Sequence, residues 1–277
     1  MSQQGQQRRR GPPGAWWKRP GWAALVGALV ATAGAVVAFA ALGLGGGERE
    51  GPEIVTEASN PGPLESASPP PPDASDDVAA AHLIASVRRG KRVAVHDRPR
   101  GEVVERAGPK SELGSPLAFG VTGRRGSWLR VATPISRENR DLWIRSDRSK
   151  LRLGRTDLSI HANLSERSVE LRRANEVLRR FSVTVGAPGS GTPSGRFAVT
   201  DTIVGGLDPV YGCCAIALSA HQPDLPPGWI GGDRVAIHGT SGPVGLAASS
   251  GCLRAADEDV RALIAAVPLG TPVVIRD

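Results

Sequence analysis

Two short stretches near the C-terminus, Ile237-His238-Gly239-Thr240 and Ser249-Ser250-Gly251-Cys252-Leu253-Arg254, hold the most informative residues of this 277-residue chain. They place one histidine and one cysteine 14 residues apart. A cysteine attacks only as its thiolate, and a neighbouring imidazole is a common means of forming that thiolate near neutral pH. Spacing alone is a weak signal, because these residue types meet by chance in many chains. The flanking sequence therefore has to decide whether the pair is catalytic.

The sequence around these stretches, from residue 156 to the end, has the pattern of a mostly β domain. Residues 256–267 predict a short helix, with acidic residues in its first turn where they suit the helix dipole. Alternating or apolar runs predict strands elsewhere. These strand candidates are residues 159–162, 169–172, 181–186, 196–200, 216–219, 234–237 and 271–275.

Four motifs, in this order, closely resemble the L,D-transpeptidase catalytic domain, also called the YkuD-like domain. They are Gly186-Ala187-Pro188, Thr192-Pro193-Ser194-Gly195-Arg196-Phe197 and the two stretches quoted above. The resemblance covers residues 156–277 and implies a β-sandwich of the L,D-transpeptidase type, with one or two short helices.

The resemblance implies that Cys252 is the nucleophile and that His238 is the base that deprotonates it. The backbone carbonyl of Gly239 would orient the imidazole through its other nitrogen. One position departs from the pattern of many members, which carry histidine where this chain has Ser250. Other members also lack that histidine, so the catalytic pair is still expected here.

The remaining implied roles concern the loop before the cysteine and the substrate. Gly251 and Cys252 would donate backbone N–H groups to the oxyanion, and a glycine here allows a tight turn. Arg254 would bind a substrate carboxylate. Ser249 and Thr240 would brace the loop.

The implied reaction takes place on peptidoglycan peptide stems and needs neither a metal nor an organic cofactor. Cys252 would attack the carbonyl of the third stem residue and expel the terminal D-alanine, and the amine of a second stem would resolve the acyl-enzyme as a 3→3 cross-link. Water as acceptor would make the site an L,D-carboxypeptidase, and a protein amine would attach that protein to the wall. A wall-binding module with an inactive catalytic domain is the alternative from another class.

The other cysteines and histidines have no catalytic partner in the sequence. Cys213 and Cys214 are adjacent, and they can be either a vicinal disulfide or two small strand residues facing opposite sides; we favour the second. His161 and His221 are expected to be structural or surface residues, although His221 could lie near the substrate cleft. Asp233-Arg234 is interpreted as a solvated pair. No cysteine–histidine grouping has zinc spacing.

Residues 78–152 read as short strands separated by turns, which suggests a small barrel or sandwich. The motif Gly126-Ser127-Trp128-Leu129-Arg130-Val131, followed by Leu142-Trp143-Ile144, resembles bacterial SH3-like domains. That resemblance implies contact with the cell wall. Trp128 and Trp143 are expected in the core of this module.

The first 77 residues predict a membrane anchor and a spacer. A basic, proline-containing tail (1–21) precedes an apolar run (22–44) that is long enough to cross a bilayer as a helix. Basic residues before the run predict a cytoplasmic N-terminus and an extracytoplasmic catalytic domain in the periplasm or cell wall. A cleaved signal peptide is the alternative. The proline- and serine-rich segment 45–77 would be a semi-extended linker.

The net charge of +7 does not indicate nucleic-acid binding. Residues 1–47 hold five arginines and lysines and no acidic residue, so the rest of the chain carries only +2. That is too little for an electrostatic footprint on a polyanion.

Overall fold

The computed structural model describes residues 81–229 and 231–277, all of which belong to one compact unit. The expected basic tail, apolar run 22–44 and linker 45–77 lie outside the described residues. Within the described ranges, no helix is long and apolar enough to span a bilayer.

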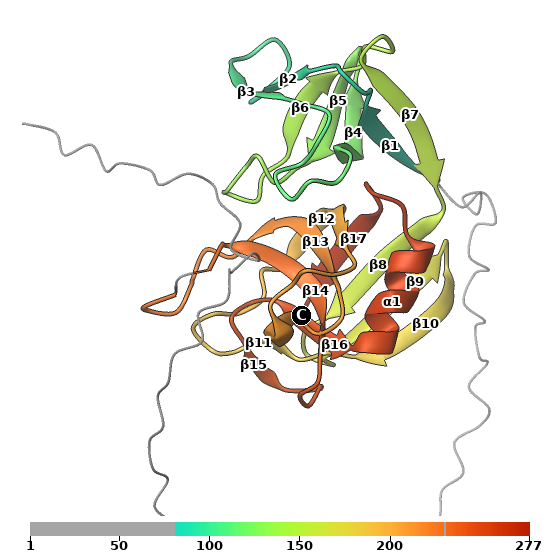
Figure 1. Ribbon diagram of the computed structural model, residues 1–277. Helices are drawn as coiled ribbons and strands as arrows, with labels where there is room; N and C mark the ends of the chain where they lie inside the picture. Colours follow the sequence, from blue (N-terminus) through green and yellow to red (C-terminus); the bar gives the residue numbers. More distant parts are fainter. Residues whose placement is uncertain (1–80, 230) are drawn as a thin grey trace, which may run out of the picture. The chain divides into compact units, whose positions relative to one another are not determined.

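Seven strands, coloured teal to green in Figure 1, form the first sheet. Their order is β3-β2-β6-β5-β4-β1-β7, and every neighbouring pair is antiparallel. The strands are β1 (His82–Val87), β2 (Val93–His96), β3 (Val103–Ala107), β4 (Ala118–Arg125), β5 (Trp128–Ala132), β6 (Leu142–Arg145) and β7 (Leu151–Thr156). The prediction of a small module of short strands is thus confirmed in its type, although β1, β3 and β7 were not predicted. Its SH3-like character stays a prediction.

The expectation that Trp128 and Trp143 lie in the core of this module is wrong. In β5 and β6 the buried positions are Leu129, Leu142 and Ile144. Both tryptophans lie on the opposite face of their strands and are only half-buried. Trp128 stacks edge-on against His96 of β2, with ring centroids 4.9 Å apart. The alternation of the strands fixes this outcome, because successive side chains point to opposite faces.

Eight strands form the second sheet, in the order β10-β9-β8-β17-β12-β13-β14-β16. The pairs β8–β17 and β14–β16 are parallel and the other pairs are antiparallel. The strands are β8 (Leu158–Asn163), β9 (Ser168–Arg173), β10 (Glu176–Ser182), β12 (Gly195–Ile203), β13 (Ala215–His221), β14 (Arg234–Thr240), β16 (Leu253–Ala256) and β17 (Pro272–Arg276). A separate parallel pair joins β11 (Val185–Gly186) to β15 (Ala247–Ser249).

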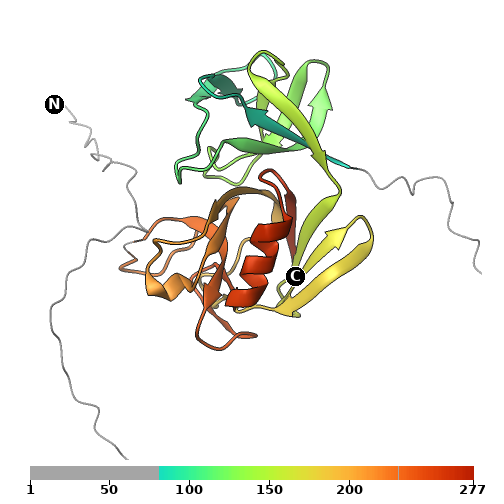
Figure 2. The same ribbon diagram turned by 45° about the vertical axis from the view of Figure 1, so that its right-hand side comes forward.

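One helix, α1 (Asp257–Ala266), covers part of this sheet and confirms the prediction for residues 256–267. Its buried residues Val260 and Leu263 join the hydrophobic core, and the helix packs against β13, β14 and β16. Arg179 of β10 pairs with Asp259 of α1 at 2.6 Å, so the β9–β10 hairpin lies beside the helix (Figure 2). A short 3₁₀ helix, η1 (Pro209–Tyr211), follows β12. The mostly β fold class is therefore confirmed.

Candidate active site

His238 lies in β14, near the end of the sheet, with Ala215 of β13 and Arg254 of β16 as its register partners. Its Nδ1 is 2.8 Å from the carbonyl oxygen of Gly239. A carbonyl can only accept, so Nδ1 carries the proton and Nε2 holds the free lone pair. Tyr211 of η1 stacks edge-on against the imidazole at 4.9 Å. Together these contacts fix both the tautomer and the orientation of the ring.

The imidazole is neutral in this state. Burial lowers the pKa of His238 to about 4; the hydrogen bond to Gly239 opposes this shift, and the charge of Arg254 adds to it. The ring is therefore ready to accept a proton at Nε2 over the whole neutral range.

Cys252 is the free cysteine of the described chain and lies in the short connection between β15 and β16. Its Sγ is 3.9 Å from the carbonyl oxygen of Arg234 on β14. Burial raises the pKa of the Cys252 thiol, while a backbone hydrogen bond from Ala236 and the charge of Arg254 act the other way. The resting pair is thus a thiol and a neutral imidazole, and a thiolate forms only by proton transfer.

The turn before the cysteine requires glycine. Gly251 has φ +110°, and a Cβ atom there would lie 2.2 Å from the side-chain nitrogen of Gln222. Gln222 is buried and donates that nitrogen to the carbonyls of Ser190 (2.9 Å) and Gly191 (2.7 Å). Any side chain at position 251 would therefore displace the amide that ties the loop at 190–191 to the cysteine loop.

Ser249 and Thr240 brace the loop, as their implied roles require. The hydroxyl of Ser249 donates to the carbonyl of Cys252 at 2.6 Å and accepts the N–H of Gly251 at 3.2 Å. Thr240 Oγ1 accepts the N–H of Gly242 at 3.0 Å, just after β14 ends. The two hydroxyls thus hold opposite ends of the segment that joins histidine to cysteine.

Arg254 is half-buried beside His238 and Cys252. Its backbone exchanges two hydrogen bonds with Thr184, at 2.8 and 2.9 Å. Its buried Nε has no hydrogen-bond partner among the described residues. A buried donor without a partner is costly, so a ligand oxygen would be a favourable partner here.

A cavity of about 200 Å³ brings these groups together. Its lining includes four residues that the sequence singled out and others that it missed. The singled-out residues are His238, Ser249, Cys252 and Arg254, and the missed ones include Tyr211, Gln222, Trp229 and Arg234. Gly239, Thr240 and Gly251 do not line it. Gly239 contributes its carbonyl to His238, Thr240 its hydroxyl to the N–H of Gly242, and Gly251 its N–H to Ser249. A lone tyrosine or glutamine carries no motif, so the sequence had no signal for Tyr211 or Gln222.

The interpretation of Asp233-Arg234 as a solvated pair is wrong for the arginine. The Arg234 side chain is 2% exposed and donates to the carbonyl of Leu218 and to Thr200 Oγ1 (2.6 Å). It also pairs with Glu112, from the loop between β3 and β4 of the first sheet. The residue whose carbonyl faces the Cys252 thiol is therefore held from both sheets.

His221 is buried rather than exposed and forms a second link between the sheets. Its Nε2 lies 2.6 Å from the carbonyl of Pro134, and its backbone exchanges two hydrogen bonds of 2.7 Å with Asn139. Its Nδ1 is 3.0 Å from Asp233 Oδ1, a contact that lowers the pKa of the aspartate. Arg137 pairs with the same aspartate at 2.5 Å.

Cys213 and Cys214 form a vicinal disulfide, so the interpretation we favoured, two separate strand residues, is wrong. The disulfide is next to the strand that carries His238, because the N–H of Gly239 donates to the carbonyl of Cys214 at 3.0 Å. Within the described residues, no group of three or more histidine, cysteine or acidic side chains could hold a metal ion.

Residues 157–275 match the model of the YkuD family, the L,D-transpeptidase catalytic domain. The Bacillus subtilis protein YqjB, provisionally named an L,D-transpeptidase, is 36% identical over 114 residues. That match covers 37% of this chain, and the chain spans 62% of the length of that relative.

Three solved structures are similar at lower identity. Bd1075 of Bdellovibrio bacteriovorus is 18% identical with a TM-score of 0.36, covering 44% of this chain and 48% of that chain. An L,D-transpeptidase of Mycobacterium tuberculosis is 16% identical with a TM-score of 0.36, covering 50% and 73%. An L,D-transpeptidase of Mycobacterium smegmatis is 15% identical with a TM-score of 0.35, covering 59% and 100%.

Proposed function

We propose that this protein is a peptidoglycan L,D-transpeptidase that forms 3→3 cross-links between peptide stems through a Cys252 acyl-enzyme. The observation that carries the proposal is the pairing of one oriented histidine with one free cysteine. His238, held by Gly239, lines the same cavity as Cys252. The match of residues 157–275 to the YkuD catalytic domain supports the substrate class.

Acylation starts from the neutral pair. The thiol proton moves to His238 Nε2 as Sγ bonds to the carbonyl carbon of the third stem residue. The tetrahedral intermediate collapses when Nε2 returns that proton to the leaving amine, and D-alanine departs. The amine of a second stem then attacks the thioester and gives a proton to Nε2. The second tetrahedral intermediate collapses with Sγ as the leaving group, and Sγ takes that proton back as the thiol. One amide is broken and one is formed, so no external energy source is needed.

The oxyanion of this intermediate needs fixed donors, and removing one typically costs on the order of 10²–10³ in rate. The N–H of Cys252 is one candidate donor. The N–H of Gly251 is the other, and it is shared with Ser249 Oγ in the resting state. Arg254 offers its unpartnered Nε to a stem carboxylate.

The test is turnover of purified tetrapeptide stems by the wild-type protein and by Cys252→Ala, with products resolved by mass spectrometry. We expect D-alanine release and 3→3 dimers from the wild type and neither from the variant. Trimmed tripeptides without dimers would reassign the acceptor to water and the protein to the L,D-carboxypeptidases. Stems unchanged by the wild type would overturn the proposal.

We also infer that the protein is exported and anchored by residues 22–44, with the catalytic domain outside the cytoplasm, and that the module formed by β1–β7 is SH3-like and contacts the wall. The charge-free apolar run and the basic residues before it support the anchor. Fractionation of a C-terminally tagged protein tests it: the tag should sediment with membranes and be accessible to external protease. A soluble exported form starting near Ala41 would overturn it.

A further inference from the structure

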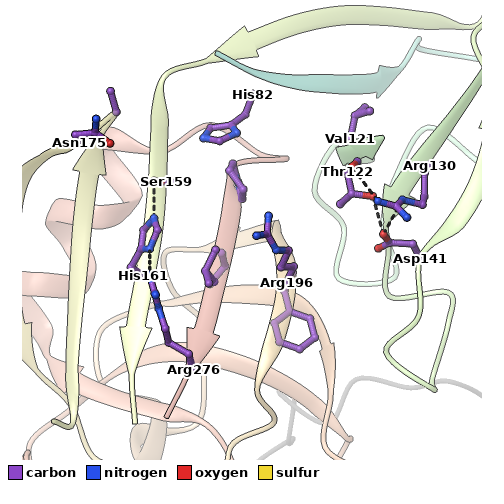
Figure 3. Close-up of a pocket in the computed structure, with 15 residues that line it drawn as sticks. His82, Val121, Thr122, Arg130, Asp141, Ser159, His161, Asn175, Arg196 and Arg276 are labelled. Atoms are coloured by element: carbon purple, nitrogen blue, oxygen red, sulfur yellow. Dashed lines mark hydrogen bonds and ion pairs between the residues drawn. The ribbon is translucent and has the colours of Figure 1, made fainter. Parts of the chain in front are cut away.

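A second hollow, of about 630 Å³, lies between β8, β17 and β12 on one side and strands of the first sheet on the other. We call it the basic crevice. It shares no lining residue with the catalytic cavity. The residues that carry the argument are His82, Arg130, Asp141, His161, Arg196 and Arg276 (Figure 3).

Strand register explains why these side chains gather. Val274 of β17 lies opposite His161 of β8 and opposite Arg196 of β12, so the three form one row across the sheet. Arg276 stands two residues further along β17, on the same face. The opposite face is the hydrophobic core, with Val273 and Phe197 buried. The row therefore faces outward, and core packing does not account for its charged members.

The charges in the basic crevice are unbalanced. Arg130 is neutralised by Asp141 at 3.4 Å, and Thr122 donates to the same carboxylate at 2.6 Å. No described carboxylate lies within ion-pair distance of Arg196 or Arg276. These two arginines occupy diagonal positions on paired strands, where the Cβ atoms are about 7–8 Å apart or less. Two long cationic side chains that start so close together can reach the same anionic ligand.

The neighbouring polar groups do not neutralise the positive charges of Arg196 and Arg276. Arg276 Nη2 reaches only His161 Nδ1, at 3.4 Å, and His161 Nε2 lies 3.0 Å from Ser159 Oγ. Burial, with smaller contributions from Arg172 and Arg276, lowers the pKa of His161, although Glu170 opposes the shift. Asp277, beside Arg276 in sequence, accepts from Ser194 instead. The imidazole is thus a neutral neighbour that offers no compensating charge.

We propose that the basic crevice is a second binding site, which holds carboxylates of an extended acidic chain. Arg196 and Arg276 each present a planar guanidinium that can take a carboxylate through two parallel hydrogen bonds. Val274 lies between them, and it and Pro272, two residues earlier on β17, offer apolar contact to the aliphatic parts of the same chain. Identifying that chain as a peptidoglycan stem rests on the proposed function. The crevice would then hold wall polymer outside the catalytic cavity.

The test is binding of the full-length Cys252→Ala protein, solubilised in detergent, to purified insoluble peptidoglycan at low salt. Adding Arg196→Ala and Arg276→Ala should weaken binding by roughly tenfold or more, because two charge-assisted contacts are lost. The matched control is Arg180→Ala with Arg261→Ala, which removes the same charge from exposed positions on β10 and α1, outside both the crevice and the β1–β7 module. The control should stay within about twofold of the parent. Equal weakening in both pairs, or no weakening in the crevice pair, would overturn the proposal.

Two further arms identify the anion and separate this inference from the proposed function. Peptidoglycan stripped of phosphate polymers should bind as before, whereas peptidoglycan with amidated carboxylates should lose the arginine-dependent part. The reverse pattern would replace carboxylate by phosphate and refute the site as stated. Turnover of soluble stems is measured separately, on the parent that retains Cys252. If the parent does not turn over stems but its binding needs Arg196 and Arg276, the crevice stands as a binding site and the transpeptidase proposal falls.

Discussion

The two sheets bury different kinds of side chains. In the first sheet the core is apolar, with Phe119, Leu129, Leu142 and Ile144 almost fully buried. The second sheet has an apolar core too, but it also buries polar groups on β13, on β14 and in the segments beside them. They include Arg234, His238, His221, Gln222 and Ser249, and most of them have hydrogen-bond partners.

This difference separates stability from chemistry. Each large apolar side chain in the first core stabilises the fold by about 1.5–3 kcal/mol through burial alone. A buried polar group adds little net stability even when it is hydrogen-bonded, and it costs stability when its partner is lost. The second sheet therefore has a less favourable interior around β13 and β14, and the candidate active site lies in that region.

Replacing His238, the proposed base, should have the largest effect, and this effect should be on activity rather than on stability. His238→Asn should lower stem turnover by roughly 10²–10⁴-fold, because no group then takes the thiol proton. The packing of the first sheet should be unchanged, and the urea midpoint of unfolding should move little. The measurement is steady-state turnover beside equilibrium unfolding. A variant that keeps more than a tenth of the parental rate would show that His238 is not the base.

The converse substitution lies in the first core. Leu142→Ala should destabilise the protein by about 2–5 kcal/mol, since it leaves a cavity at a fully buried position. Turnover per folded molecule should remain within about twofold of the parent. Active-site titration of the folded fraction gives this ratio. A specific loss of turnover would break the separation between the sheets.

The pH dependence of stability should differ between the parent and His238→Asn. The folded pKa of His238 is about 4, below its ordinary value of 6.5, so the unfolded chain binds the extra proton first as the pH falls. This contribution is present above pH 6.5 and is lost between pH 6.5 and pH 4. It amounts to on the order of 3 kcal/mol. Urea unfolding at intervals across this window should show a steeper fall for the parent than for the variant; parallel curves would contradict the shifted pKa.

The smallest expected effect tests whether the separation is complete. Glu112 belongs to the first module but pairs with Arg234, whose carbonyl faces the Cys252 thiol. Glu112→Gln should lower turnover by only a few-fold, because the carboxylate is partly exposed and exposed pairs contribute little. Glu102→Gln, an exposed acid of the same module, is the control. If the two variants behave alike, the first module has no influence on the chemistry.

The sequence predicted which residues meet in the candidate site better than it predicted the contacts that hold them. His238, Cys252 and Gly251 stand in local motifs, and local motifs are readable without a fold. The partners that hold them come from distant segments: Gln222 bonds to residues 190–191, and Arg234 bonds to Glu112. No periodicity encodes such contacts, because they depend on which loops meet.

The tryptophan prediction failed for a different reason. In Trp128-Leu129-Arg130-Val131 the phase that contains Trp128 also contains Arg130, which is exposed. Residue size favoured a buried tryptophan, whereas alternation favoured Leu129 and Val131, and alternation was right. The prediction for Cys213 and Cys214 failed because it assumed a strand, in which adjacent side chains point apart. These residues lie in a turn, and the turn brings the two sulfurs together.

The pairing of His238 with Arg254 across β14 and β16 makes the site a reporter of folding. These strands are parallel, so no tight hairpin can join them, and their alignment forms only when the intervening segment has closed. A slip of one residue would turn His238 to the opposite face and expose the buried Leu253. The rate at which activity returns during refolding would therefore measure when β14 and β16 align. This rate can be compared with the rate at which β structure appears in the sheet as a whole.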